Sequence, residues 1–190
     1  DDKLNLCYFF HDLNAKITNI FDNRNRMSLS VYSGEDKMST KDDSNDDYGT
    51  SYSDKDLTKN DFNWGNFNMA LLFEHQFSPK LFANFNAVYT YNISKYKSQE
   101  DESSKKEQNI LNESHYEHEY KSSIRDYGYR MSFDYRPSPH HHIRFGNDFT
   151  WHFFHPQTRN LISSDTSMGN DTTFMSSKIN YPARECSLYA

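Results

Sequence analysis

The sequence has no long hydrophobic run, few cysteines and no excess of basic residues. No stretch approaches the 18–20 consecutive apolar residues of a transmembrane helix, so that element is excluded. The two cysteines, Cys7 and Cys186, have no zinc-binding pattern around them, and we expect both to be unpaired because they fall in the first and last predicted strands. The net charge of −6 argues against a nucleic-acid partner, since such proteins usually present a basic surface.

Signatures of enzymes are missing as well. The chain contains no Gly-rich phosphate loop, no nucleophile elbow and no paired-carboxylate motif. We therefore expect no catalytic residue, no cofactor and no enzymatic activity.

Low overall hydropathy coexists here with many aromatic residues. Hydrophobic residues make up 35% of the chain and the mean hydropathy is −1.00, which taken alone would suggest a soluble, partly disordered chain. The aromatic content of 16% contradicts disorder. A membrane-spanning β-barrel reconciles the two values, because only alternate residues of its strands touch lipid and its loops are polar.

A two-residue alternation recurs along the chain and is clearest in Leu81–Lys95. Its odd positions include Phe85, Tyr89 and Ile93, whereas its even positions are mainly Asn, Thr and Ser. Successive side chains of a strand point to opposite faces, so this segment predicts a strand with one apolar and one polar face. Its length exceeds the usual 5–6 residues of a soluble strand and suffices to cross a bilayer.

The same alternation predicts seven strands, joined by connections of alternating length. The predicted strands are Leu6–Phe21, Arg26–Lys37, Phe62–Phe77, Leu81–Lys95, Tyr120–Arg136, His142–His155 and a last strand from near Ala183. Tight turns are predicted at Asp22–Asn25, Ser78–Lys80 and Pro137–His141. Long polar loops are predicted at Met38–Asp61, Ser98–Glu119 and Pro156–Pro182. Short turns at one end and long loops at the other are typical of an outer-membrane barrel.

Charged residues gather on one face of the fifth and sixth predicted strands. Six of them are candidates for a face turned toward the barrel lumen or toward a domain inside it: Asp126, Arg130, Asp134, Arg136, Arg144 and Asp148. In a soluble sheet the same residues would simply form the wet face, and one strand alone does not distinguish these cases. Strand number, strand length and the alternating connections favour the barrel.

The predicted loops hold the remaining candidates. Tyr48, Tyr52 and Tyr116 are candidate ligand contacts, because aromatic rings could stack on a sugar or a chelate ring, and they could equally belong to the aromatic girdle at the membrane interface. The histidine run His140–His142 is interpreted as a wet turn, since adjacent strand residues point to opposite faces and cannot share one ion. We expect no metal site in the chain.

Several segments resemble one known family. The stretches Tyr8–Lys37, Trp64–Asn92, Ser122–Pro156 and Ala183–Ala190 resemble, in this order, barrel strands of TonB-dependent outer-membrane receptors. In the second stretch, Trp-Gly-Asn opens a strand and Phe-Ser-Pro-Lys-Leu-Phe makes its periplasmic turn. The resemblance covers nearly all predicted strands and is weak in the three long loops.

This resemblance implies a receptor in the outer membrane of a Gram-negative bacterium. The family has a 22-stranded barrel that encloses an N-terminal plug, and it imports a metal chelate, cobalamin or a glycan with energy delivered by the inner-membrane TonB complex. Nothing here matches the plug, so we expect residues 1–190 to be part of the barrel, forming an open curved antiparallel sheet by itself. The implied partners are outer-membrane lipid, the plug and the TonB complex through a region absent here, with a surface lipoprotein as a further candidate. The alternatives are a passive porin or adhesion barrel, and a soluble β-sandwich binding protein.

Overall fold

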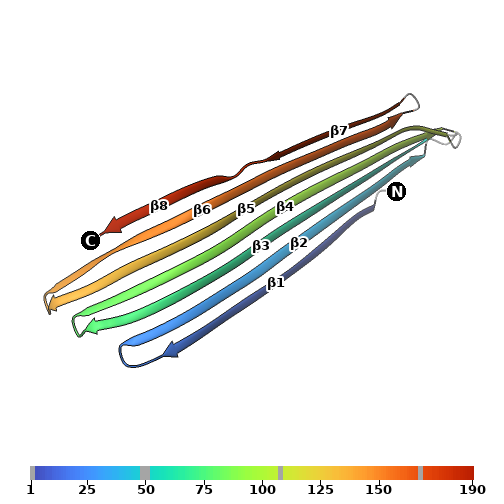
Figure 1. Cartoon of the computed structure of the whole chain (residues 1–190). Coiled ribbons are helices and arrows are strands. Elements are labelled where there is room, and N and C mark those ends of the chain that lie inside the picture. Colours follow the sequence, from blue (N-terminus) through green and yellow to red (C-terminus); the bar gives the residue numbers. More distant parts are fainter. Residues whose placement is uncertain (1–2, 48–51, 107–108, 167–168) are drawn as a thin grey trace.

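The fold is a single antiparallel β-sheet. The computed structural model describes residues 3–47, 52–106, 109–166 and 169–190, and no helix occurs in these ranges. The strands are β1 (Lys3–Ile20), β2 (Asn25–Asp47), β3 (Tyr52–Ser78), β4 (Leu81–Lys106), β5 (Asn109–Ser138), β6 (His141–Thr166), β7 (Gly169–Lys178) and β8 (Tyr181–Tyr189). Each strand from β1 to β6 pairs with the next in sequence, so the topology is up-and-down and the sheet is open (Figure 1).

The last two strands share one edge of the sheet. β7 pairs with Gln157–Thr166 of β6, and β8 pairs with Gly146–Phe154 of the same strand. Figure 1 shows β7 and β8 following one another along β6. The last predicted strand, expected to begin near Ala183, corresponds to β8, which begins at Tyr181, whereas β7 was not predicted and falls in the predicted loop Pro156–Pro182. Pro182 is tolerated in β8 because proline fits an edge strand, where one side of the backbone has no partner.

The three long polar loops predicted from the sequence are wrong. Met38–Asp61, Ser98–Glu119 and Pro156–Pro182 lie mostly in strands, and only residues 48–51 separate β2 from β3. Polar segments can form strands here because the hairpin ladder satisfies their backbone groups and cross-strand side chains pair. Examples are Tyr96 Oη donating to Asn60 Oδ1 at 3.0 Å and Lys97 Nζ lying 3.1 Å from Glu117 Oε2.

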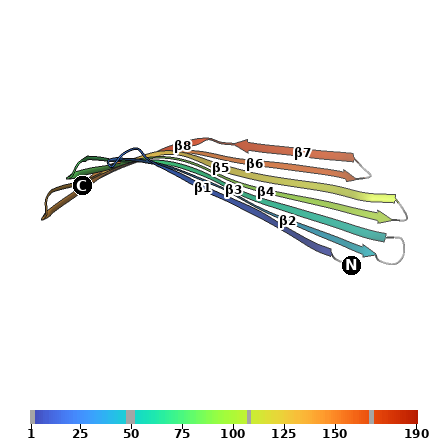
Figure 2. The ribbon, with the colours of Figure 1, turned by 90° about the horizontal axis from the view of Figure 1, so that it is seen from below.

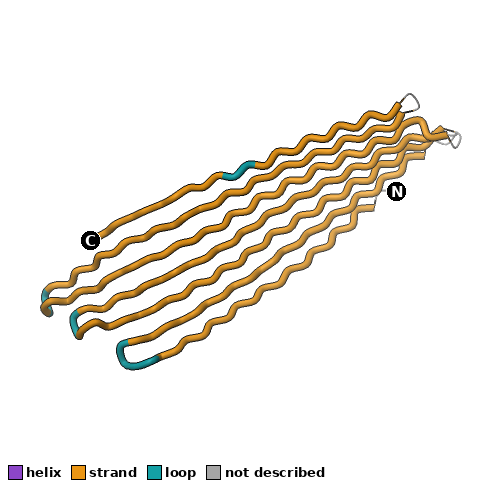
Figure 3. Tube along the Cα trace, viewed as in Figure 1, coloured by secondary structure: helices purple, strands orange, loops and turns teal. Residues whose placement is uncertain are grey.

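The predicted short turns are confirmed at the other end of the sheet. The chain turns at Phe21–Arg24, Pro79–Lys80 and Pro139–His140, which Figure 3 shows as short loop segments at one end. The strands between these turns and the far end reach 30 residues in β5. At about 3.3 Å per residue a strand of that length extends about 100 Å.

The sheet has no second layer over it within the described residues. Ala83 is the only hydrophobic residue there that is buried, whereas Leu71, Tyr127 and Tyr129 are 40%, 50% and 44% exposed. Figure 2 shows the sheet close to edge-on as one layer that bends along its length. Cys7 and Cys186 are both free, as the sequence predicted, since they lie in β1 and β8 near opposite edges.

Candidate functional site

The register of the strands sorts the side chains into two faces. Directly paired residues point to the same side of a sheet, and in β1–β6 even-numbered residues pair with even-numbered ones, except where the register shifts at Gln76/Ser78, Ser104/Lys105 and Tyr135/Ser138. We call this side the even face, and it is joined by odd-numbered residues of β7 and β8 because Gly146 pairs with Tyr189. The opposite side is the odd face.

The six charged candidates from the sequence lie together on the even face. Asp126, Arg130, Asp134 and Arg136 come from β5, and Arg144 and Asp148 come from β6. The pairing sets Arg130 opposite Asp148 and Asp134 opposite Arg144, so opposite charges meet across the hairpin. Arg130 Nε donates to Asp148 Oδ1 in a close ion pair.

Asp134 is the centre of one cluster near the short turns. Its carboxylate accepts hydrogen bonds from His142 Nε2 at 2.7 Å, Arg136 Nε at 3.2 Å and Arg144 Nε at 3.4 Å. The carboxylate is 20% exposed, but the two arginine side chains are 65% and 70% exposed. Such exposed pairs stabilise a fold by about 0–1 kcal/mol each, so this cluster contributes little to stability and leaves its arginine side chains largely in contact with solvent.

A second cluster lies around Asp126, farther along β5 from the short turns. Thr90 Oγ1 donates to Asp126 Oδ2 at 2.9 Å, and His152 Nδ1 lies 2.8 Å from Asp126 Oδ1. His152 Nε2 has no hydrogen-bond partner among the described residues, and Glu185 of β8 lies 3.7 Å away. The sequence reasoning did not single out Thr90, His152 or Glu185. The even parity of Thr90 and His152 would have placed them on this face, but the register is needed to see that they meet Asp126.

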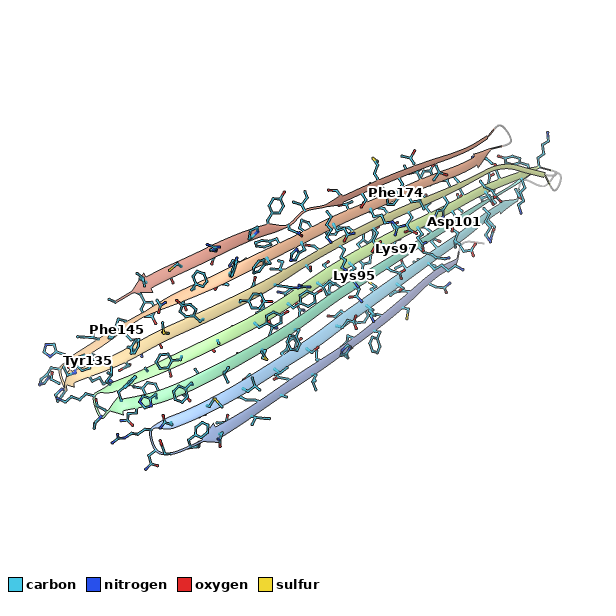
Figure 4. The ribbon with its side chains drawn as sticks, in the orientation of Figure 1. Lys95, Lys97, Asp101, Tyr135, Phe145 and Phe174 are labelled. Atoms are coloured by element: carbon cyan, nitrogen blue, oxygen red, sulfur yellow. The ribbon has the colours of Figure 1, made fainter. Side chains whose placement is uncertain are left out.

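The odd face carries a continuous band of aromatic rings near the short turns. Ring centroids lie 5.9 Å apart between Phe85 and Phe133 and 5.0 Å apart between Phe133 and Phe145. Tyr89 and Tyr127 continue the band at 5.1 Å. Figure 4 labels Tyr135 and Phe145 at this end of the sheet. A connected apolar surface of this kind, left uncovered, marks an interaction with an apolar partner.

The two faces exchange character farther along the strands. Beyond Ile93, the odd face of β4 continues with Lys95, Lys97, Gln99 and Asp101, three of which Figure 4 labels. The even face becomes aromatic at the same level, because Phe62 pairs with Tyr96 and Tyr96 with Tyr120. The rings of Phe62 and Tyr96 are 4.6 Å apart, and Phe62 stacks on Trp64 at 5.8 Å.

The three tyrosine candidates fall in this farther half. Tyr116 lies in β5 on the even face and is 38% exposed, and Tyr52 begins β3 on the same face. The expectation that these two residues lie in loops is wrong, because the strands extend past them. Tyr48 lies outside the described residues. Tyr52 pairs with Lys106 and Tyr116 with Glu100, so the structure does not bring the two rings together.

Two glycines let tyrosine rings lie flat on the even face. A Cβ at Gly146 would meet Met131 O and would lie 2.6 Å from Tyr189 Oη. A Cβ at Gly34 would lie 2.5 Å from Tyr32 Oη, whose hydroxyl donates to Asp12 Oδ1 at 2.7 Å. Both positions therefore need glycine for close approach.

The described residues contain neither a metal-binding cluster nor a membrane-spanning helix. In the described ranges, no group of three or more His, Cys, Asp or Glu residues is arranged to hold a metal ion. No helix among the described residues is long and apolar enough to span a membrane.

Comparisons with known proteins found similarity among solved structures. No family model and no curated protein matches the chain. Among solved structures, the chain is similar to the ferric yersiniabactin uptake receptor FyuA from Yersinia pestis, at 6% sequence identity and a TM-score of 0.19. The match covers 95% of this chain and 42% of the receptor chain, so the chain spans less than half of that protein.

Proposed function

We propose that this sheet is part of the wall of a β-barrel in the outer membrane of a Gram-negative bacterium. Near the short turns, the aromatic odd face contacts lipid and the charged even face lines the lumen. The observation that carries this proposal is the aromatic band itself, which crosses the four strands β3 to β6 and has no covering layer in the described chain.

Energetics favour lipid as the partner of the odd face. Moving one large apolar side chain out of water stabilises a structure by about 1.5–3 kcal/mol, so an uncovered band of many rings is costly in solution. The even face cannot take the place of a core, because it would bury Asp126, Arg130, Asp134 and Asp148. A bilayer covers the band and leaves those charges in a wet lumen.

The finer proposal is a TonB-dependent receptor, supported by the family resemblance of the strands. The lumenal charges of β5 and β6 would hold a plug domain by polar contacts and line the path when it moves. The imported nutrient would be a metal chelate, cobalamin or a glycan. Energy would come from the TonB complex, and the barrel wall would carry out no chemistry. A surface lipoprotein remains a further candidate partner.

Cysteine accessibility tests the placement of the two faces. Cys7 and Cys186 are first replaced by serine, and single cysteines are then placed at Ala87 and Tyr89 on the odd face or at Asn86 and Thr90 on the even face. In outer-membrane preparations, the odd-face cysteines should react with a lipid-soluble maleimide and resist a membrane-impermeant one, and the even-face cysteines should show the reverse. Equal reaction of all four with the water-soluble reagent would refute a lipid-facing odd face.

A transport assay tests the receptor against a passive porin. Neutralising Asp126, Arg130, Asp134 and Arg136 together in the complete protein should alter TonB-dependent uptake while leaving membrane insertion intact. Unchanged uptake by this variant would contradict the lumenal assignment. Uptake that persists in cells without TonB, with a steady open conductance in planar bilayers, would favour the porin.

A further inference from the structure

A row of lysines crosses the odd face just beyond the aromatic band. The register links Lys37, Asn63, Lys95, Lys121, Gln157 and Lys178 in one line from β2 to β7. The row contains four lysines and no acidic residue. Figure 4 labels Lys95 near the middle of the sheet, where the row crosses β4.

Three of these lysines have no ion-pair partner among the described residues. Lys37 Nζ lies 3.2 Å from Glu35 Oε1. Lys95, Lys121 and Lys178 form no ion pair with any described residue. Lys95 and Lys121 are directly opposite one another, an arrangement of like charges that destabilises a strand pair. An anion bound between them would remove that repulsion.

The neighbouring acids are already matched by other cations. Lys97 Nζ lies 3.1 Å from Glu117 Oε2. Glu119 stands opposite Lys97 on one side and Arg159 on the other. The excess positive charge therefore belongs to the lysine row and not to the whole odd face.

A shallow groove joins the row to the aromatic band. Its lining includes Tyr91, Lys121, Arg125, His155 and Lys178, and it contains no carboxylate. The Arg125 guanidinium lies over the Tyr91 ring, 5.3 Å from its centroid, so it marks the boundary between the rings and the cations. A molecule in this groove would meet cations at one end and aromatic side chains at the other.

We propose that Lys95, Lys121, Arg125 and Lys178 bind the phosphate groups of an anionic membrane lipid whose acyl chains lie along the aromatic band. This inference rests on the proposed function, because the band must face lipid for the row to lie at headgroup level. Lysine and arginine both bind phosphate, and cations near a membrane surface strengthen the attraction to anionic lipid. Adjacent strands are about 4.8 Å apart, so Lys95 and Lys121 can reach one phosphate together.

Native mass spectrometry of the complete protein in detergent tests the proposal. The probe is lipid A with both phosphates, and its dephosphorylated form is the matched control ligand. The quadruple variant K95Q/K121Q/R125Q/K178Q should bind at least tenfold less lipid A than the unmodified protein. The reason is that each cation contributes about fivefold to the binding constant for anionic lipid. The control variant K41Q/K55Q/K59Q/K105Q carries the same charge change on the same face, far from the band, and should bind like the unmodified protein.

The possible outcomes separate this inference from the proposed function. The inference would be overturned if both quadruple variants bound the same amount of lipid A. It would also be overturned if the unmodified protein bound dephosphorylated lipid A as well as it binds lipid A. Complete displacement of lipid A by excess inorganic phosphate at constant ionic strength would also overturn it, because the site would then recognise free phosphate. Both variants should insert into membranes normally. Failure of the unmodified protein to insert would instead contradict the proposed barrel.

Discussion

At the turn between β1 and β2, one carboxylate organises the backbone. Asp22 accepts hydrogen bonds from the backbone N–H groups of Arg24 at 2.7 Å and Asn25 at 2.8 Å, and from Asn25 Nδ2 at 2.7 Å. An aspartate that bonds to backbone groups two and three residues ahead is a standard way to fix a turn. The turn holds the register between β1 and β2, which in turn decides which side chains share a face.

The Asn25 side chain and the turn amides lower the pKa of Asp22 below its usual value of 3.8. Because the folded pKa is the lower one, ionised Asp22 stabilises the turn above pH 3.8, and this contribution is lost as the pH falls through the folded pKa. We predict that NMR titration of Asp22 gives a midpoint below 3.8 and that Asn25→Ala raises it. An unshifted midpoint in the unmodified protein would contradict the turn geometry.

At the scale of the element, the β4–β5 hairpin keeps unlike surfaces on its two sides. The Tyr89 ring contacts the Tyr127 ring at a tilted angle on the odd face, while Thr90 donates to Asp126 on the even face one residue later. Adjacent positions of one strand therefore meet different surroundings. Substitutions of the same chemistry at neighbouring residues should therefore destabilise the protein to different extents.

Lysine placed at two neighbouring positions of β4 tests this difference. Ala87→Lys puts a charge at the middle of the proposed lipid-facing band and should destabilise the inserted protein by about 2–4 kcal/mol. Asn86→Lys puts the same charge on the even face, where Arg130 is its register partner, and should cost less than about 1 kcal/mol. Urea unfolding from lipid bilayers measures both. A larger loss for Asn86→Lys would reverse the assignment of the faces.

The strands near the short turns could be predicted from sequence because their apolar residues alternate. Phe85, Tyr89 and Ile93 define a face without any structure, and Asp22 and Pro79 mark turns by their chemistry. The halves of the strands far from the short turns could not be predicted this way. In Lys95–Asp101, for example, the odd positions are polar or charged, so they define no apolar odd face. The sequence placed the charged residues on one face only through their even residue numbers. The pairs in this site, such as Thr90 with Asp126, depend on turn lengths that set the register.

At the scale of the whole molecule, the sheet ends in two unpaired edges. β1 forms one edge, and β7 with β8 forms the other. Open edges present free backbone donors and acceptors that can pair with further strands. In the proposed barrel those edges continue into neighbouring strands of the same wall.

The distance between these edges predicts the state of the cysteines. Cys7 and Cys186 lie in β1 and β8, six strand steps apart, which corresponds to about 29 Å across the sheet. A disulfide needs Cα atoms within about 7 Å, so both thiols should remain free after treatment with an oxidant. Thiol counting in denaturant measures this. As a positive control, cysteines at the paired positions Asn84 and Ser132 should cross-link. A Cys7–Cys186 bridge within one chain would show that the sheet closes differently.

In most of the sheet, even-numbered residues pair with even-numbered ones. The effect of a deletion within a strand should therefore depend on whether it removes one residue or two. Removing one codon between Asn84 and Asn92 of β4 inverts the side-chain order for the rest of that strand, so rings meant for one side move to the other. Removing two codons restores the order and only shortens the strand. We predict that single-codon deletions abolish accumulation in the membrane and that two-codon deletions at the same sites retain it, as measured by immunoblot of membrane fractions. Equal loss in both classes would show that strand length, and not phase, limits assembly.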